Sequence, residues 1–118
     1  MSYVTADEFT CKCGCNQNDI SMQLVSRLNT ARQKAGVPFI INSGYRCKSH
    51  NAAVGSKSTV HVKGLAADIR TLDSRTRYKV LTALIEQGFS RIGIAKSFIH
   101  VDIGDHAGFD PEVVWTYN

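Results

Sequence analysis

Two short stretches of the sequence contain residue types that could bind a metal ion. The first begins at His61 and ends at Asp68, and the second contains His100. Two imidazoles and one carboxylate suit a borderline-soft divalent cation such as zinc, and three protein ligands leave a fourth position open for water. Such water has its pKa lowered from about 15.7 to about 7. The residue types and their spacing therefore predict a zinc hydrolase.

The composition is that of one globular domain. The chain has 118 residues, of which 43% are hydrophobic and 20% charged, so we expect a single domain over 1–118 that begins with a Cys-rich segment, 1–19. The N-terminus has neither a basic region nor an apolar one, which predicts no signal peptide, and no apolar run is long enough to span a bilayer. The net charge of +4 is scattered. We therefore expect no nucleic-acid partner, no membrane insertion and a monomer.

Apolar periodicity predicts two helices. The first begins near Ser21 and ends at Gly36, and the second is capped by Asp73 or Ser74 and ends at Gly88. Short strands are predicted at 38–42, 64–70, 92–94 and 98–103, and the tail 111–118 is predicted to pack as an edge. The segment 43–63 reads as a long loop, which is usually functional in a small domain. The expected inward positions are Leu24, Val25, Leu28, Ala31 and Ala35 in the first helix and Tyr78, Leu81, Leu84 and Ile85 in the second.

Alternation along the strands places the polar candidates on one face. Asp68 lies opposite Ala67 and Ile69, and His100 and Asp102 lie opposite their apolar neighbours. Both strands thus have an apolar back and a polar front. This is typical of an α+β domain in which helices pack on one face of a sheet and a site lies on the other.

The sequence resembles the D-alanyl-D-alanine carboxypeptidase family of zinc peptidases, in particular its small phage- and bacteria-associated branch. The resemblance covers roughly residues 36–118 and rests on four ordered motifs. It implies a small α+β domain with helices packed on one face of a mainly antiparallel sheet, as in the signalling domain of hedgehog proteins. The motifs are Ser43-Gly44-Tyr45-Arg46, His50-Asn51 with Val54-Gly55, His61-x-x-Gly64-x-Ala66-Ala67-Asp68, and Phe98-Ile99-His100-Val101-Asp102.

The resemblance also implies roles for individual residues. His61, Asp68 and His100 would bind zinc, and Arg46 would hold the carboxylate of the substrate or the oxyanion. The implied reaction is hydrolysis of peptide bonds in peptidoglycan stem peptides, either removing a terminal D-alanine or cutting between L-alanine and D-glutamate. The further substrate-binding candidates are Tyr45, His50 and Thr59, although Tyr45 and Trp115 are expected chiefly to pack and His50 is equally compatible with bracing the loop.

One departure from the family pattern concerns the general base. Many members have an acidic residue three positions before the last zinc ligand, where this chain has Ser97. Asp102 is the nearest substitute because it shares a face with His100, but it could instead orient His100 from behind. A second assignment, in which Asp102 binds zinc and His100 is the base, is open; we favour His100 as the ligand.

The cysteines allow three interpretations. Cys11, Cys13 and Cys15 are spaced two apart and Cys47 is distant, which differs from the Cys-x-x-Cys of common zinc modules. Reduced thiols, a structural metal site and disulfides are all compatible with this spacing, in decreasing order of expectation.

Two functions from different classes follow. The first is a zinc metallopeptidase acting on peptidoglycan, an endolysin of phage type or a bacterial relative, held in the cytoplasm until release to the cell wall or carried in a virion. The second is a zinc-stabilised binding domain of the same fold that has lost catalysis, which the absence of an acidic residue at Ser97 favours.

Overall fold

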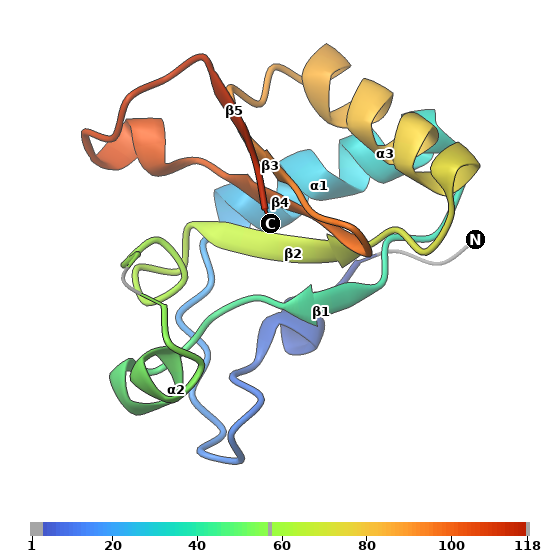
Figure 1. Ribbon diagram of the computed structural model, residues 1–118. Helices are drawn as coiled ribbons and strands as arrows, with labels where there is room; N and C mark the ends of the chain where they lie inside the picture. The colour runs from blue at the N-terminus through green and yellow to red at the C-terminus, as the bar shows by residue number, and fades with distance from the viewer. Residues whose placement is uncertain (1–3, 57, 118) are drawn as a thin grey trace.

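A five-stranded mixed sheet with the order β1-β2-β4-β3-β5 forms the centre of the molecule (Figure 1). This computed structural model describes residues 4–56 and 58–117. All neighbouring strands are antiparallel except β3 and β5, which are parallel. The elements are η1 (Ala6–Phe9), α1 (Met22–Ala35), β1 (Ile41–Ser43), α2 (Lys48–Ala53), β2 (Ala66–Arg70), α3 (Ser74–Glu86), β3 (Arg91–Ile94), β4 (Phe98–Asp102), η2 (Gly104–Ala107) and β5 (Val113–Thr116).

The first predicted helix is confirmed with its limits. The Ser21 hydroxyl accepts a hydrogen bond from the Leu24 amide, and Gly36 ends α1 in the left-handed conformation with φ 70°. These are the start and stop signals read from the sequence. The predicted inward positions of α1 are buried except Ala35, which is partly buried against the core.

The second predicted helix is confirmed as α3, and its inward face was predicted only in part: Leu84 is buried and Leu81 is partly buried, but the other two predicted positions are exposed. Asp73 is the N-cap, and its carboxylate accepts from the Thr76 amide at 2.8 Å. Tyr78 and Ile85 are 71% and 55% exposed, whereas the buried positions of α3 are Val80, Ala83 and Leu84. Apolar residues occupy two adjacent stripes of this helix, and only one of the two stripes is fully buried.

Two loop-region predictions need correction. The strand predicted at 38–42 is β1, which begins only at Ile41 and is irregular between Ile41 and Ser43. The long loop contains a helix, α2, whose Cys47 cap accepts from the His50 amide. Only Asn51 of α2 is buried, so its sequence carries no apolar period that could have revealed it.

The sheet has an apolar face and a polar face, as the alternation along the strands predicted. The core lies between the sheet and the pair α1 and α3, which Figure 1 shows on one side of it. The predicted edge position of the tail agrees with β5, which lies at the sheet edge beside β3, while Asn118 and residues 1–3 lie outside the described residues. The α+β class is confirmed. In the described part of the chain, no helix is both long and apolar enough to cross a membrane. The core residues of the central strands are Ala67, Ile69, Ile92, Ile99 and Val101.

Candidate metal and active site

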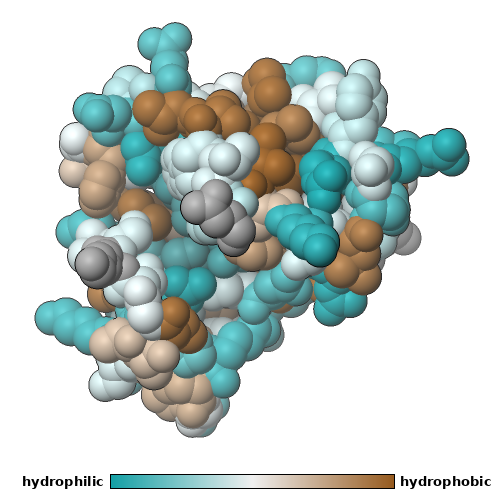
Figure 2. All heavy atoms as spheres, viewed as in Figure 1, coloured by the Kyte–Doolittle hydropathy of each residue, from teal (hydrophilic) through white to brown (hydrophobic). Residues whose placement is uncertain are grey.

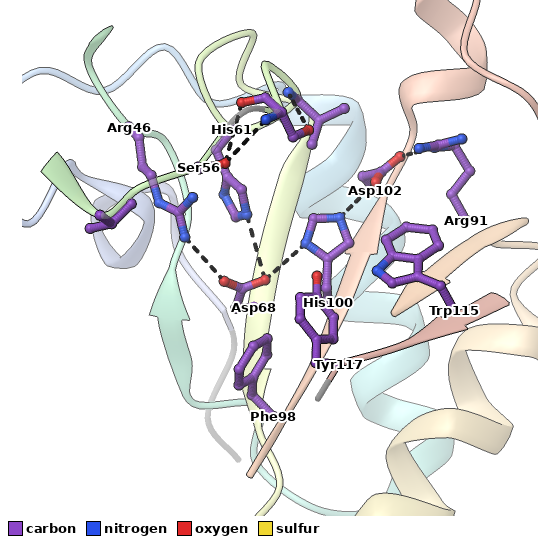
Figure 3. Close-up of a pocket in the computed structure, with 13 residues that line it drawn as sticks. Arg46, Ser56, His61, Asp68, Arg91, Phe98, His100, Asp102, Trp115 and Tyr117 are labelled. Atoms are coloured by element: carbon purple, nitrogen blue, oxygen red, sulfur yellow. Dashed lines mark hydrogen bonds and ion pairs between the residues drawn. The ribbon is translucent and has the colours of Figure 1, made fainter. Parts of the chain in front are cut away.

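Strand pairing brings two of the three predicted metal ligands together. Asp68 in β2 and His100 in β4 are direct cross-strand partners on the face away from the helices. The Oδ1 atom of Asp68 lies 2.9 Å from Nδ1 of His100 and 3.5 Å from Nε2 of His61 (Figure 3). His61 comes from the turn that precedes β2. All three residues are buried, at 4–7% exposure.

The protonation of His61 follows from its partner. Its Nδ1 lies 2.7 Å from the carbonyl oxygen of Gly44, and because a carbonyl only accepts, Nδ1 must carry the proton. In the neutral ring the lone pair is therefore on Nε2, the nitrogen that faces Asp68, and this nitrogen donates to Asp68 only when the ring carries a second proton. A backbone carbonyl that fixes the tautomer in this way is the usual partner of a metal-binding histidine.

His100 lies between two carboxylates. Its Nδ1 faces Asp68, and its Nε2 lies 2.6 Å from Oδ2 of Asp102. Burial acts to lower the pKa of His100, but the hydrogen bonds with Asp102 and Asp68 outweigh it and raise that pKa. Burial likewise acts to raise the pKa of Asp68, yet the bonds from His100 and His61 hold it well below its usual range. A metal cation could take the place of the proton on Nδ1 of His100 and would balance the negative charge of Asp68 in the same way.

The donor set fits zinc. One ligand atom from each of His61, Asp68 and His100 lies within 4.8 Å of the others. Nitrogen and oxygen ligands about 2.0–2.2 Å from a tetrahedral zinc lie about 3.3 Å from one another. The distances of 2.9 and 3.5 Å bracket that value. Nδ1 of His61 already bonds to Gly44, and Nε2 of His100 already bonds to Asp102. The other nitrogen of each ring, which faces Asp68, is therefore the one available to a metal.

Asp102 lies behind the His100 ring, on the side opposite Asp68 (Figure 3). Its Oδ1 accepts from Nε of Arg91 at 2.6 Å and from the Gly104 amide at 2.8 Å, and its side chain is fully buried. Burial acts to raise the pKa of Asp102, but the bonds from His100, Gly104 and Arg91 lower it. This placement favours the interpretation in which Asp102 orients His100 over the one in which it is the general base.

Arg46 closes the other side of the site. Its Nη2 donates to Oδ2 of Asp68 at 3.4 Å, Nε donates to the Ser43 hydroxyl at 3.0 Å, and Nη1 donates to Oδ1 of Asn51 at 3.3 Å. These contacts use three of the five N–H groups of a guanidinium, so two remain for a bound molecule. The Arg46 side chain is 14% exposed and borders the pocket.

These groups form one side of a cavity of about 410 Å³, a size typical of small-molecule sites. Figure 2 shows hydrophilic atoms in a recess of this face of the molecule. Aromatic side chains form the wall next to His100, and the Trp115 ring lies 5.4 Å from its imidazole. Gly93 makes this possible, because a Cβ there would collide with the Trp115 indole. The lining residues that were not predicted as site residues are Val54, Ser56, Ser58, Val60, Arg91, Phe98, Trp115 and Tyr117.

Three predicted substrate-binding residues do not line this cavity. Tyr45 is buried against Cys11 and Cys47, which agrees with its expected packing role. His50 lies in α2, where its amide donates to Cys47, and Thr59 is exposed on the turn before His61. Trp115, by contrast, was expected to pack and instead borders the cavity. Its parallel pairing with β3 puts it opposite Gly93, and that register has no signature in the sequence.

The four cysteines converge at a second place. Sγ of Cys13 lies 3.5 Å from that of Cys11 and 3.6 Å from that of Cys47, and all four sulfurs lie within 4.8 Å of one another. All four are free cysteines. Burial acts to raise the pKa of Cys11, but amide hydrogen bonds from Cys47 and Cys13 lower it to about 6.

A family model described as Peptidase M15 matches residues 2–102 of the chain. The match covers most of the chain and contains His61, Asp68 and His100, and it ends before the strand that carries Trp115. No curated protein matches the sequence. The chain belongs to the peptidase M15 family, whose members are zinc-dependent peptidases.

Proposed function

We propose, starting from membership of the peptidase M15 family, that this chain is a zinc-dependent peptidase of peptidoglycan stem peptides. It would act as a D-alanyl-D-alanine carboxypeptidase or as an L-alanyl-D-glutamate endopeptidase. The observation that carries the proposal is the convergence of His61, Asp68 and His100 beside a cavity of about 410 Å³. Three protein ligands are the number found in catalytic zinc sites.

Zinc bound by these residues would supply a Lewis acid for the scissile carbonyl and a water nucleophile near neutral pH. The chain supplies the geometry. Gly44 holds the tautomer of His61, and Asp102 holds the ring of His100, so that one nitrogen of each imidazole faces Asp68. Arg46 holds the second oxygen of Asp68. Each ligand is thus fixed by a partner outside the metal site.

Arg46 is the group that would stabilise negative charge on the substrate. Arg46 borders the cavity next to Asp68, and two of its N–H groups are not used by the contacts described above. A guanidinium at this place can bind an oxyanion or a carboxylate in two positions. Stem peptides offer such a carboxylate on terminal D-alanine and on D-glutamate, which is why this class of substrate suits the cavity.

Digestion of purified cell walls tests the proposal. The zinc-loaded chain would be incubated with peptidoglycan of several stem compositions, and the released fragments would be identified by mass spectrometry. We expect release of D-alanine or a new L-alanine carboxyl end, and the product mass names the bond. Asp68→Asn is the matched inactive control, and Asp105→Asn, half-buried in η2 and outside the cavity lining, is the active one. Intact walls after incubation with fully loaded protein would refute peptidase activity.

One observation favours a second candidate, the zinc-stabilised binding domain. Among the described residues that line the cavity, the carboxylates are Asp68 and Asp102, and both are engaged. Ser97 lies exposed in the turn between β3 and β4 and does not border the cavity. If the missing base cannot be replaced, the chain would sediment with peptidoglycan without cleaving it. Cosedimentation measured with the digestion separates the two functions.

A further inference from the structure

The four cysteines form a cluster outside the cavity that the proposed peptidase does not use. Cys11, Cys13 and Cys15 come from the segment between η1 and α1, and Cys47 precedes α2. Cys11 and Cys47 are buried, whereas Cys13 and Cys15 are exposed. Packing as small apolar side chains explains the buried pair only, because exposed thiols have no such reason to converge on buried ones.

The backbone of the segment is folded so that alternate side chains face one point. The Cys11 amide donates to the Gln17 carbonyl at 2.9 Å and closes the loop 11–17. Within it, Gly14 has φ 90° and Asn16 has φ 61°, the left-handed region that ordinary residues avoid. These turns bring three sulfurs of a short sequence to the same side, opposite Cys47.

The sulfur spacing is that of a metal site. Four sulfurs about 2.3 Å from a tetrahedral zinc lie about 3.8 Å from one another. Here the Cys11–Cys13 pair is at 3.5 Å and the Cys13–Cys47 pair at 3.6 Å, with every pair within 4.8 Å. Backbone amides of Cys47 and His50 also donate to Sγ of Cys11 and Cys47, both at 3.4 Å. Such donors stabilise sulfur that carries negative charge.

We propose that Cys11, Cys13, Cys15 and Cys47 bind one zinc ion in a closed, structural site. Four protein ligands leave no position for water, which is the mark of a structural zinc. Each thiol that becomes a ligand releases its proton to solvent, so that zinc uptake liberates up to four protons and needs no oxidant. Two disulfides among the same residues would need an oxidant and would require each bonded sulfur pair to approach to about 2.05 Å.

This zinc would fix the segment that carries Arg46 and Gly44. Cys47 follows Arg46 directly, and the Tyr45 amide donates to the Phe9 carbonyl at 2.8 Å. Phe9 also lies directly against Gly44, whose carbonyl accepts from His61. The structural zinc is therefore joined to the metal-binding imidazole through one short stretch of backbone.

Metal content tests the proposal independently of any peptidase activity. The purified full chain should contain two zinc ions by plasma mass spectrometry, and Cys13→Ser with Cys15→Ser should reduce this to one. Gln17→Ser is the matched control from the same loop, because its backbone carbonyl is retained, and it should keep two. His100→Ala should also leave one zinc, at the cysteines. A content of one that His100→Ala abolishes would overturn the cysteine site and leave the proposed peptidase untouched.

A second measurement applies even if the cysteine variants fail to fold. Cobalt exchanged into the unmodified chain should show intense sulfur-to-cobalt charge-transfer absorption, and a spectrum with nitrogen and oxygen ligation alone would overturn the proposal. The intact mass under denaturing conditions, without reductant, should correspond to four thiols. A mass lower by two hydrogens for each disulfide, or iron in place of zinc, would likewise overturn it.

Discussion

The two clusters of candidate metal ligands differ in how they are built. His61, Asp68 and His100 lie mainly on the sheet, where the hydrogen-bonded register of β2 and β4 holds two of them. The cysteines lie on segments without sheet pairing and are gathered by left-handed turns and by one helix cap. In the first cluster the packed sheet positions the ligands. In the second cluster the backbone has no such support, so the bound metal itself must fix the segments that carry the cysteines.

This contrast teaches which cluster depends on metal for its shape. In the sheet cluster, the polar groups have protein partners without metal, because Asp68 pairs with His100 and Arg46 and His61 bonds to the Gly44 carbonyl. The cysteine cluster consists of thiols whose mutual contacts are weak hydrogen bonds. Loss of metal should therefore cost function at the first cluster and stability at the second.

The largest effect is expected from Asp68→Asn. Removing the shared carboxylate should lower peptidase activity on stem peptides by on the order of 10³-fold and remove one zinc ion, since all three ligands act as a unit. The circular dichroism spectrum should remain that of the folded chain. Unfolding of this variant would contradict the view that the sheet positions the ligands without metal.

Asp102→Asn distinguishes an orienting role from that of a general base. If Asp102 orients His100, the zinc affinity of the sheet cluster should fall by about 10–100-fold, with activity restored in part by excess zinc. Competition with a chelator measures the affinity. Unchanged zinc affinity together with lost activity would instead make Asp102 the base. Asp105→Asn again provides the control.

The double variant Cys13→Ser with Cys15→Ser should show the opposite of what is expected for Asp68→Asn: a large loss of stability and a small loss of activity. We expect the melting temperature to fall by about 10 °C because a structural zinc contributes folding free energy. Activity well below the melting temperature should stay within about tenfold of the unmodified chain, since Arg46 is displaced but present. Thermal scans and kinetics on one preparation measure both. A variant that is fully stable yet inactive would place the cysteines in catalysis.

Gly93→Ala should have a modest effect on the aromatic wall. The added methyl group would displace Trp115 from its place beside His100, so we expect activity to fall by about two- to tenfold. Trp115 is the only tryptophan, so its fluorescence reports the displacement directly. Thr116→Ala changes an exposed residue in β5, the strand of Trp115, and should leave both the activity and the tryptophan fluorescence unchanged.

Asp73→Ala should have the smallest effect and affect neither cluster. The Thr76 amide lowers the pKa of Asp73, so its contribution to stability is full above the unfolded value of about 3.9 and is lost as pH falls. We expect the melting temperature to fall by about 3 °C or less at neutral pH, and by less still below pH ~3. Zinc content should stay at two. A lost zinc ion would show that general destabilisation imitates the cysteine variants.

The sequence was most informative where local patterns act alone. Alternation placed Asp68 and His100 on the polar face, and cap residues located both long helices. Prediction from the sequence failed where the contacting residues are far apart along the chain. Neither the approach of Trp115 across Gly93 nor the salt bridge of Arg91 with Asp102 has a local signature, because each depends on which strands pair and in which register.

The sequence allowed Cys47 to converge on the first three cysteines but could not select this interpretation, for the same reason. The convergence depends on how Phe9 and Tyr45 dock, which no spacing rule describes. The buried face of α3 shows a different limit, since two apolar stripes compete and only tertiary packing selects between them. The two long helices and the central strands were therefore predictable, whereas α2 and the cavity wall were not.

The pairing of Asp68 with His100 makes their separation a property of strand register and independent of loop length. An insertion inside β4 would turn the imidazole toward the core, but lengthening the segment 105–112 or the turn at 54–55 would leave both ligands in place. The sheet thus fixes the two ligands, while the segments outside the paired strands can vary in length. Replacing those segments is a route to peptidases with new sequence preferences.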